Sequence, residues 1–423
     1  EVAYFVDGVS QQDLQTGRSS TSINSNAIDQ VVVTVGGFDA EYGRVMSGIV
    51  NVVTKEGGRS YHGSVEGITD ELSGEWIDTP SFGHNNVDGA LGGPILPGSD
   101  RISFFVSGEL RDLKDRLPRW GAKAMDFEKN TLSAEEFQLL SDGLLPHHTM
   151  QGQSWQSKLT FRLSDKIDLK AGFLGSTQDE EQYRHHYRYN LRHAPVVDRF
   201  NNSVFAKLTY TVNPKTFLTV ESNAFVNRYI RADGVHGDDI NAYGRPGGNP
   251  RFDPETLFYT SDLDSTAHSR DADGFITGDE GHVWDDYIKR RSFYITPIDI
   301  DVTSQVTPNH QVKAGFDVQF HKLRYYRHLF PTLSYRGAFN GPDDPGGFQD
   351  VDRYGYDYNF NSKTFENRDD GRNNTKEPIL AALYLQDKIE FEGLVVNLGV
   401  RYDYLDGSYP GPARRRCAFR GRL

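Results

Sequence analysis

The sequence predicts an all-β protein, in which a transmembrane antiparallel β-barrel follows a small domain lodged inside it. Apolar and polar residues alternate over about 11 segments of roughly ten residues each, as barrel strands require. The connections between these segments are alternately short and long. A glycine-rich unit at 28–58 precedes them and carries two apolar runs without this alternation.

The composition suits strands that show one face to an apolar and one to an aqueous environment. Hydrophobic residues make up only 37%, yet the chain holds 22 Tyr, 26 Phe and 42 Gly. No run of about 18 uninterrupted apolar residues exists, which excludes a transmembrane helix but not barrel strands of about 10 residues. The net charge of −13 argues against nucleic acid as a partner. A lone cysteine, Cys417, excludes a disulfide framework and a cysteine-based zinc site.

The first elements are two short strands around a turn. The β-branched run 31–35 ends at Gly36-Gly37, and a second apolar run covers 48–55. The polar connector between them carries Tyr42-Gly43, where glycine can adopt a positive φ. We expect both strands to be buried.

The wall strands are recognised by their period of two. In the clearest, 101–112, Val106 and Leu110 face one way while Ser107 and Glu109 face the other. A face that carries so many charges must be wet. We expect strands at 61–69, 86–95, 101–112, 153–163, 166–176, 203–212, 215–228, 292–306, 311–321, 379–390 and 394–404.

The lengths of the connections give an independent signal. Short turns are expected at 97–99, 164–165, 213–214, 307–309 and 391–393, and long segments at 69–85, 113–152, 177–202, 229–290 and 323–378. Structureless loops of that length are uncommon in compact domains. Strict alternation is typical of outer-membrane barrels, with short periplasmic turns and long extracellular loops. A soluble sandwich would scatter loop lengths over both ends.

Two segments carry a resemblance to a known family. The strand VAYFVDGVS, the patterns I-x-x-V, A-x-Y-G and G-x-V-N-V-x-T-K, and LYLQDKIEFEGLVVNLGVRYDYLDG at 383–407 resemble TonB-dependent outer-membrane receptors, in particular their Oar-like branch. In that branch a carboxypeptidase-regulatory-like domain precedes the plug and the barrel. The residues that match the plug motif are Asp7, Gly8, Gly36, Gly37, Tyr42, Gly43, Gly48, Asn51, Thr54 and Lys55.

The resemblance implies a domain plan. Residues 1–58 correspond to the C-terminal part of the plug domain, and 59–408 to the first half of the barrel, about 11 of about 22 strands. The signal peptide, the first part of the plug and the segment that contacts TonB are expected before Glu1. Residues 409–423 form an atypical basic tail with five arginines, which we interpret as an off-pattern terminus in preference to an interaction arm.

The resemblance also implies a function in the bacterial outer membrane. Such a receptor binds an extracellular ligand and imports a large substrate, an oligosaccharide, peptide or chelate, through a plugged barrel without bond-making chemistry. Its partners are membrane lipid, lipopolysaccharide and a TonB-type energy-coupling protein. The connector reads VGGFDAEYG where siderophore receptors often have an arginine-glycine-proline turn, which weakens the inference to iron chelates.

Charges of the plug offer contacts with the wall. Glu41, Arg44, Lys55 and Glu56 could pair with inward charges, which include Lys158, Arg162, Asp168, Lys170, Asp299 and Asp301. A wide lumen needs an occluding domain, and such pairs would hold it. For any single pair, however, we expect solvated charges.

Three loop segments could bind ligands or ions. The acidic loop 269–280 fits part of a calcium motif through Ser269, Asp271, Asp273 and Glu280, but without flanking helices we favour a solvated loop over structural calcium as a cofactor. The segment 183–193 offers His185, His186 and His193 to a metal, lipopolysaccharide or ligand; its tyrosines are typical of an interfacial aromatic girdle. A third, aromatic segment could bind sugars or peptides, or be ordered by its own packing, through Tyr325, Tyr326, Tyr354 and Tyr356.

Two other function classes compete. A passive porin shares the barrel but needs no plug, and a secreted all-β carbohydrate-binding protein or hydrolase shares the strands but not the membrane. No Ser-His-Asp order, P-loop or dinucleotide fingerprint stands at a strand-to-helix junction, so we assign no catalytic residues and expect no enzyme. Detergent-dependent solubility separates the barrel from the secreted class.

Overall fold

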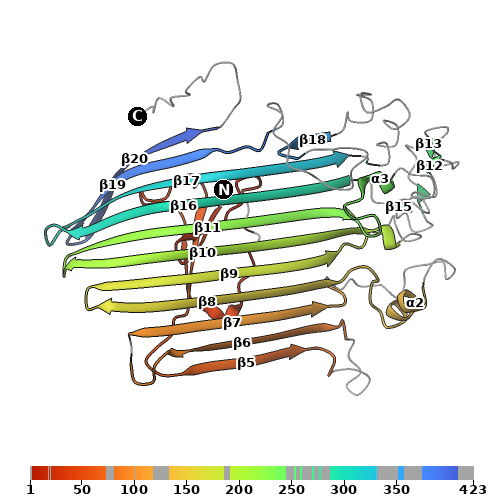
Figure 1. The fold of residues 1–423 in the computed structure, drawn as a ribbon, viewed down its shortest axis with the longest axis horizontal. Helices are drawn as coiled ribbons and strands as arrows, with labels where there is room; N and C mark the ends of the chain where they lie inside the picture. The colour runs from red at the N-terminus through yellow and green to blue at the C-terminus, as the bar shows by residue number, and fades with distance from the viewer. Residues whose placement is uncertain are drawn as a thin grey trace, which may run out of the picture.

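Two large β-sheets build most of the described part of the chain: a four-stranded inner sheet, β1–β4, and a twelve-stranded wall, β5–β11 with β16–β20; β12-β13 and β14-β15 form two small sheets beside them. The computed structural model describes residues 2–17, 19, 21–72, 81–99, 101–117, 133–184, 191–243, 286–329, 331, 351–356 and 374–407, and four two-residue strands between 252 and 277. Figure 1 shows the wall strands stacked in chain order, with the red N-terminal strands crossing the middle of the wall.

The inner sheet has the order β2-β1-β4-β3, with β1 parallel to β4 and the other pairs antiparallel. Its strands are β1 Val2–Val6, β2 Val9–Ser10, β3 Ile28–Thr34 and β4 Gly48–Thr54, and the 3-10 turn η1 Ser25–Ala27 precedes β3. Asp7 (φ 51°) and Gly8 (φ 95°) join β1 to β2. Positive φ at both residues of a two-residue hairpin loop is the type I′ turn, which Asp-Gly favours.

Each wall strand on the path from β5 to β20 is antiparallel to its neighbours, and β18 pairs only with β17. The wall strands are β5 His62–Thr69, β6 His84–Pro94, β7 Ile102–Leu113, β8 Met150–Ser164, β9 Ile167–Glu181, β10 Pro195–Asn213, β11 Thr216–Asp233, β16 Asp286–Gln305, β17 His310–Leu329, β18 Val351–Tyr354, β19 Ile379–Phe391 and β20 Leu394–Asp406. Outside the wall lie α2 Ala134–Ser141, η4 Leu191–His193, α3 Ile240–Tyr243, β12 Phe252–Asp253, β13 Phe258–Tyr259, β14 Ser269–Arg270 and β15 Ile276–Thr277.

Short turns lie at one end of the wall and long connections at the other, as the sequence predicts. In Figure 1, α2, α3, β12, β13, β15 and β18 gather at the end opposite the short turns. Several strands extend further toward that end than predicted. Strand β10 begins at Pro195, and not near residue 203, and it stays in register with β11 up to the pair Pro195↔Asp233. Hydrogen bonding between strands therefore continues where the apolar–polar alternation has ended.

The wall is apolar on its outer face and polar on its inner face. On β8, Gln156, Lys158 and Thr160 are buried, whereas Leu159 between them is 39% exposed. The same inversion recurs on β10, where Ser203 is 4% and Val204 48% exposed. Apolar-out, polar-in alternation is what a wall between lipid and a polar lumen requires. Among the described residues, no helix is long and apolar enough to cross a membrane.

Candidate functional site

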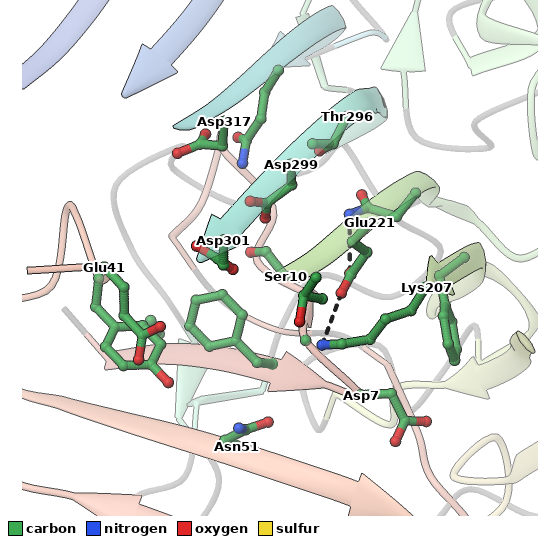
Figure 2. A pocket seen from close by; sticks show the side chains of 18 of the residues that line it. Asp7, Ser10, Glu41, Asn51, Lys207, Glu221, Thr296, Asp299, Asp301 and Asp317 are labelled. Atoms are coloured by element: carbon green, nitrogen blue, oxygen red, sulfur yellow. Dashed lines mark hydrogen bonds and ion pairs between the residues drawn. The ribbon is translucent and has the colours of Figure 1, made fainter. Parts of the chain in front are cut away.

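A polar cavity of about 560 Å³ lies between the inner sheet and the wall. Strands β1, β2 and β4, the β1–β2 turn and the connector between β3 and β4 form one side of it. Eight wall strands, β8–β11, β16, β17, β19 and β20, contribute to the other. Figure 2 shows Asp7, Glu41 and Asn51 of the inner part near Lys207, Glu221 and three wall aspartates. The two sheets thus meet across charged groups and not across an apolar core.

Lys158 of β8 is the central contact between the two sheets. Its ammonium group lies 2.9 Å from Asp7 Oδ1 and donates to the Thr54 carbonyl oxygen at 2.9 Å, with only 2% of its side chain exposed. Asp7 in turn accepts a hydrogen bond from the Thr54 backbone N–H at 3.0 Å. A buried ammonium needs this set of acceptors, because an unpaired charge away from water is very costly. Lys158 therefore fixes the β1–β2 turn and the end of β4 against the wall.

Glu56, just after β4, extends this contact along the wall. Its Oε1 lies 2.6 Å from Lys170 Nζ on β9 and 3.8 Å from Lys158 Nζ. Glu56 is therefore paired with wall lysines, and not solvated alone, although about a third of its side chain stays exposed. Figure 2 also shows an ion pair within the wall, between Lys207 and Glu221 at 3.2 Å.

The connector between β3 and β4 is held by the later wall strands. Lys313 of β17 pairs with Glu41, so here too the charge is paired and not solvated. Gln386 of β19 accepts from the Ala40 N–H at 2.7 Å and donates to Asp39 Oδ1 at 2.9 Å. Arg401 of β20 donates to the Ala40 carbonyl at 3.3 Å. Main-chain and side-chain contacts together fix the path of the connector.

Tyr42 and Arg44 project from the connector into the lumen. Burial raises the pKa of the Tyr42 phenol, and the nearby Asp39 and Asp301 carboxylates raise it further. Burial lowers the pKa of Arg44, an effect that the Asp317 carboxylate opposes. Arg44 donates to Gln319 Oε1 at 3.2 Å, and the Tyr42 ring packs on Phe5 at 5.6 Å between centroids.

The motif glycines take different roles. Gly36 (φ 75°) and Gly37 (φ 61°) adopt the left-handed conformation that the sequence suggests for a turn. At Tyr42-Gly43 the expectation is wrong, because the positive φ falls on Arg44 (60°). A Cβ on Gly43 would lie 2.6 Å from Arg401 Nε. Glycine at this position therefore leaves room for the Arg401 side chain of the wall to lie against the connector.

The remaining motif residues lie in or next to β4. Gly48 opens the strand opposite Val2 of β1, and Asn51 and Thr54 lie within it. The backbone N–H of Lys55 donates to the Ala27 carbonyl at 2.8 Å. Asn51 Oδ1 is buried with no hydrogen-bond partner among the described residues, and the residue lines the cavity. The cavity therefore offers an unused acceptor beside the charged groups.

Charges of both signs line the wall side of the cavity, four carboxylates beside five cations. Asp299 and Asp301 of β16, Asp317 of β17 and Glu221 of β11 line it, as Figure 2 shows. Tyr384 of β19 donates a hydrogen bond to Asp301. The cations that face these groups come from both sheets. The interface thus consists of polar contacts, each of which water could also satisfy.

The four predicted ligand-binding tyrosines separate into two pairs. Tyr325 and Tyr354 stack at 5.7 Å between ring centroids where β18 pairs with β17. Tyr326 and Tyr356 instead belong to a buried cluster with Tyr287. Gln15, between β2 and β3, donates to the Tyr354 hydroxyl at 3.0 Å and to the Arg324 carbonyl at 2.9 Å. The connection between β2 and β3 of the inner sheet therefore contacts the long-connection end of the wall directly.

Some predicted sites lie outside the described residues. Asp271, Asp273 and Glu280 of the calcium prediction are among these, and Ser269 is described only as part of β14. His185 and His186 also lie outside them, whereas His193 is described in η4.

Comparisons with known proteins agree with this architecture. No family model matches the chain. Over 160 residues it is 29% identical to the TonB-dependent transporter Oar of Myxococcus xanthus, covering 34% of this chain and 15% of that protein. Among solved structures, it superposes on the pyoverdine outer membrane receptor FpvA of Pseudomonas aeruginosa PAO1 with a TM-score of 0.55 at 12% identity, covering 96% of this chain and 50% of FpvA.

A second solved structure gives the same result. The siderophore receptor PirA of Acinetobacter baumannii matches with a TM-score of 0.54 at 14% identity, covering 96% of this chain and 49% of PirA. The chain thus spans about half the length of these two structures. At such identities the likeness establishes the fold.

Proposed function

We propose that this chain, a TonB-dependent receptor of the outer membrane that is Oar-like over part of its length, binds an extracellular substrate. It imports this substrate past a movable plug. The substrate is a solute too large for passive diffusion: an oligosaccharide, a peptide or a chelate. Residues 1–58 act as the later part of the plug, and residues 59–408 as barrel wall with long extracellular loops.

The observation that carries this proposal is the buried contact of Lys158 with Asp7 and the Thr54 carbonyl. A plug must stay seated at rest and yet leave its seat under force. Removing one partner from a buried ion pair is costly, so the contact seats the plug specifically. An apolar interface between plug and wall would be stabilised much more by burial, and water could not replace its contacts when the plug moves.

The outer end of the wall offers a place where a ligand could be sensed. Tyr325 and Tyr354 present stacked rings, and Gln15 of the inner part holds both Tyr354 and the Arg324 carbonyl. A ligand that moved these rings would change the hydrogen bonds of Gln15 directly, because Gln15 donates to the Tyr354 hydroxyl. A TonB-type protein would supply the force on the inner side, and lipid and lipopolysaccharide would surround the wall.

A reversible cross-link between plug and wall tests the proposal. The Ser22 backbone N–H donates to Ser176 Oγ of β9 at 3.4 Å, so Ser22→Cys with Ser176→Cys, in a Cys417→Ser background, places two thiols within reach of a short methanethiosulfonate cross-linker. Growth of a complemented deletion strain on oligosaccharides, peptides or ferric chelates reports import. Cross-linking should abolish growth on one substrate class, and a reductant should restore it.

The control joins two wall strands. Ser154→Cys with Ser176→Cys bridges opposed residues of β8 and β9 and leaves the inner sheet free. Import should persist in this variant. If the plug–wall bridge also leaves import unchanged, transport does not need plug movement, and the passive porin becomes the better account.

A further inference from the structure

A second group of polar side chains lies far from the inner-sheet interface, at the long-connection end of β10 and β11. His193, Asp233 and His236 each offer one metal-ligating atom, and these atoms all lie within 4.8 Å of one another. His193 ends the turn η4 just before β10, Asp233 is the last residue of β11, and His236 follows three residues later. The pairing of β10 with β11 brings the three together.

The backbone around these side chains is fixed without any ion. The Asp233 side chain is fully buried, and its Oδ1 accepts from the N–H groups of Val235 and His236 at 2.9 and 2.8 Å. A Cβ on Gly234 would lie 2.4 Å from the Arg192 carbonyl oxygen, so the turn after β11 packs directly on η4. The carboxylate and both imidazoles are thus held on two touching turns.

The two imidazoles lie next to one another, and both are close to the carboxylate. The His193 and His236 rings are 5.0 Å apart between centroids, and His193 Nδ1 lies 2.9 Å from both Asp233 oxygens. Ligand atoms around a tetrahedral zinc ion, with bonds of about 2.0–2.1 Å, are separated by roughly 3.4 Å. The His193–Asp233 spacing is already shorter than this value, and all three ligand atoms lie within 4.8 Å of one another.

We propose that His193, Asp233 and His236 bind a divalent transition-metal ion of the zinc class, with one position left for water. Two imidazoles and one carboxylate suit zinc, whereas calcium and magnesium prefer sets made of oxygen. The ion clips η4 to the turn after β11, at the root of the long connection to β16. This site is independent of the import proposal and of the calcium motif at 269–280.

Cobalt(II) titration followed by visible absorption tests the site. The protein is purified from membranes in detergent without a polyhistidine tag, washed with chelator, titrated with cobalt and then challenged with zinc. We expect one cobalt per chain with tetrahedral d–d bands that zinc abolishes. His236→Gln should weaken binding by at least about 100-fold, since loss of an outer-shell partner alone costs about 10- to 100-fold.

The chain offers a matched control at the opposite end of the wall. His310 Nδ1 lies 2.8 Å from Asp387 Oδ2, a histidine–aspartate pair of the same kind, and His310→Gln should leave cobalt binding unchanged. His193→Gln is a second test should His236→Gln fail to fold, as judged by heat-modifiable migration on a gel. Absence of a tetrahedral spectrum, equal loss in His310→Gln, or wild-type affinity in both folded site variants would overturn the proposal.

Discussion

Lys158 shows how single residues decide the contact between the inner sheet and the wall. Its place on the polar face of a wall strand follows from the alternation of β8, and so does its direction into the lumen. Its partners do not follow, because Asp7 and Thr54 are far away in sequence and reach it only after the inner sheet has formed. The sequence predicted the set of inward charges but favoured solvated charges over any single pair, because the partners come together only when the inner sheet and the wall meet.

Lys158→Met should loosen the inner sheet. It leaves the Asp7 carboxylate buried without its ammonium partner, at an expected cost of about 3–5 kcal/mol. Hydrogen exchange in β4, measured in detergent, should lose at least roughly a hundredfold in protection, which corresponds to about 3 kcal/mol.

The control for Lys158 is an exposed pair. Lys114 and Glu71 lie 3.1 Å apart with about half of each side chain exposed, so Lys114→Met should leave the protection of β4 nearly unchanged. Equal small effects of the two variants would show that the buried pair does not seat the inner sheet.

A second prediction concerns the close contact between Gly43 and Arg401. A Cβ at this position would meet the Arg401 guanidinium, so Gly43→Ala should displace Arg401 from the connector and cost about 1–3 kcal/mol in urea unfolding. Arg401→Ala should remove most of that cost in the double variant, because the two residues share one contact.

Gly36→Ala is the comparison for Gly43. It has open space but a φ of 75°, so its cost should not depend on Arg401. Additive effects for Gly43→Ala and Arg401→Ala would contradict the close contact. Sequence alone pointed to a special glycine at 43 but assigned the wrong reason, since a long-range approach leaves no local signal.

At the scale of elements, helix α2 shows a local signal in the sequence that strand counting overlooked. Ser133 caps the helix and Glu136 completes a capping box, the S-x-x-E pattern of a helix start. Glu136 Oε1 also lies 2.7 Å from His147 Nε2, and His147 Nδ1 lies 3.3 Å from Glu181 Oε1. The helix is thus tied to the end of β9 through the His147 side chain.

This tie should depend on pH. Burial lowers the pKa of His147, but hydrogen bonds to Glu181 and Glu136 raise it more, so the folded pKa lies above the ordinary 6.5. Its stabilisation is complete below pH 6.5 and is lost as the pH rises through the folded value. Burial raises the pKa of Glu136, but bonds from Ser133 and His147 lower it below 4.5, so this contribution is lost only in acid, as the pH falls through that lowered value.

Hydrogen exchange of 134–141 measures this dependence. Protection should be highest between about pH 4.5 and 6.5 and fall above that window by up to about tenfold for each unit of the His147 shift. His147→Gln should remove the alkaline loss, once intrinsic exchange rates are corrected for pH. A loss of the same size in His147→Gln would assign it to another group.

Among the other elements, predictability follows the range of the interactions. The short turns and wall strands were found because alternation and turn residues are local. The type I′ turn at Asp7-Gly8 also has a local signal, the Asp-Gly dipeptide. Matching these two residues to a family motif does not by itself predict a hairpin. Strand β18 has no such signal, because its four residues form a strand only by pairing with the end of β17.

At the scale of the whole molecule, the inverted distribution of polar residues decides the environment of the wall. Polar residues of the wall face the inner sheet and apolar residues face outward, which a water-soluble β-sandwich reverses and a lipid-facing barrel requires. This much could be read from the sequence, because alternation and loop lengths extend over the entire wall. Contacts between distant segments could not be predicted in this way. They include the contacts of the inner sheet with the wall, the stacking of Tyr325 on Tyr354 and the cluster at His193.

The central claim is that neighbouring wall residues face lipid and plug in turn, and spin labels on β10 test it most directly. Val204→Cys and Ser203→Cys, labelled one at a time in a Cys417→Ser background and reconstituted in lipid vesicles, report collisions with oxygen and with a water-soluble nickel chelate. We predict high oxygen and low nickel accessibility at 204, and low accessibility to both reagents at 203, where the side chain is buried beside Gln11. High nickel accessibility at 204, or oxygen accessibility at 203 equal to that at 204, would contradict the account.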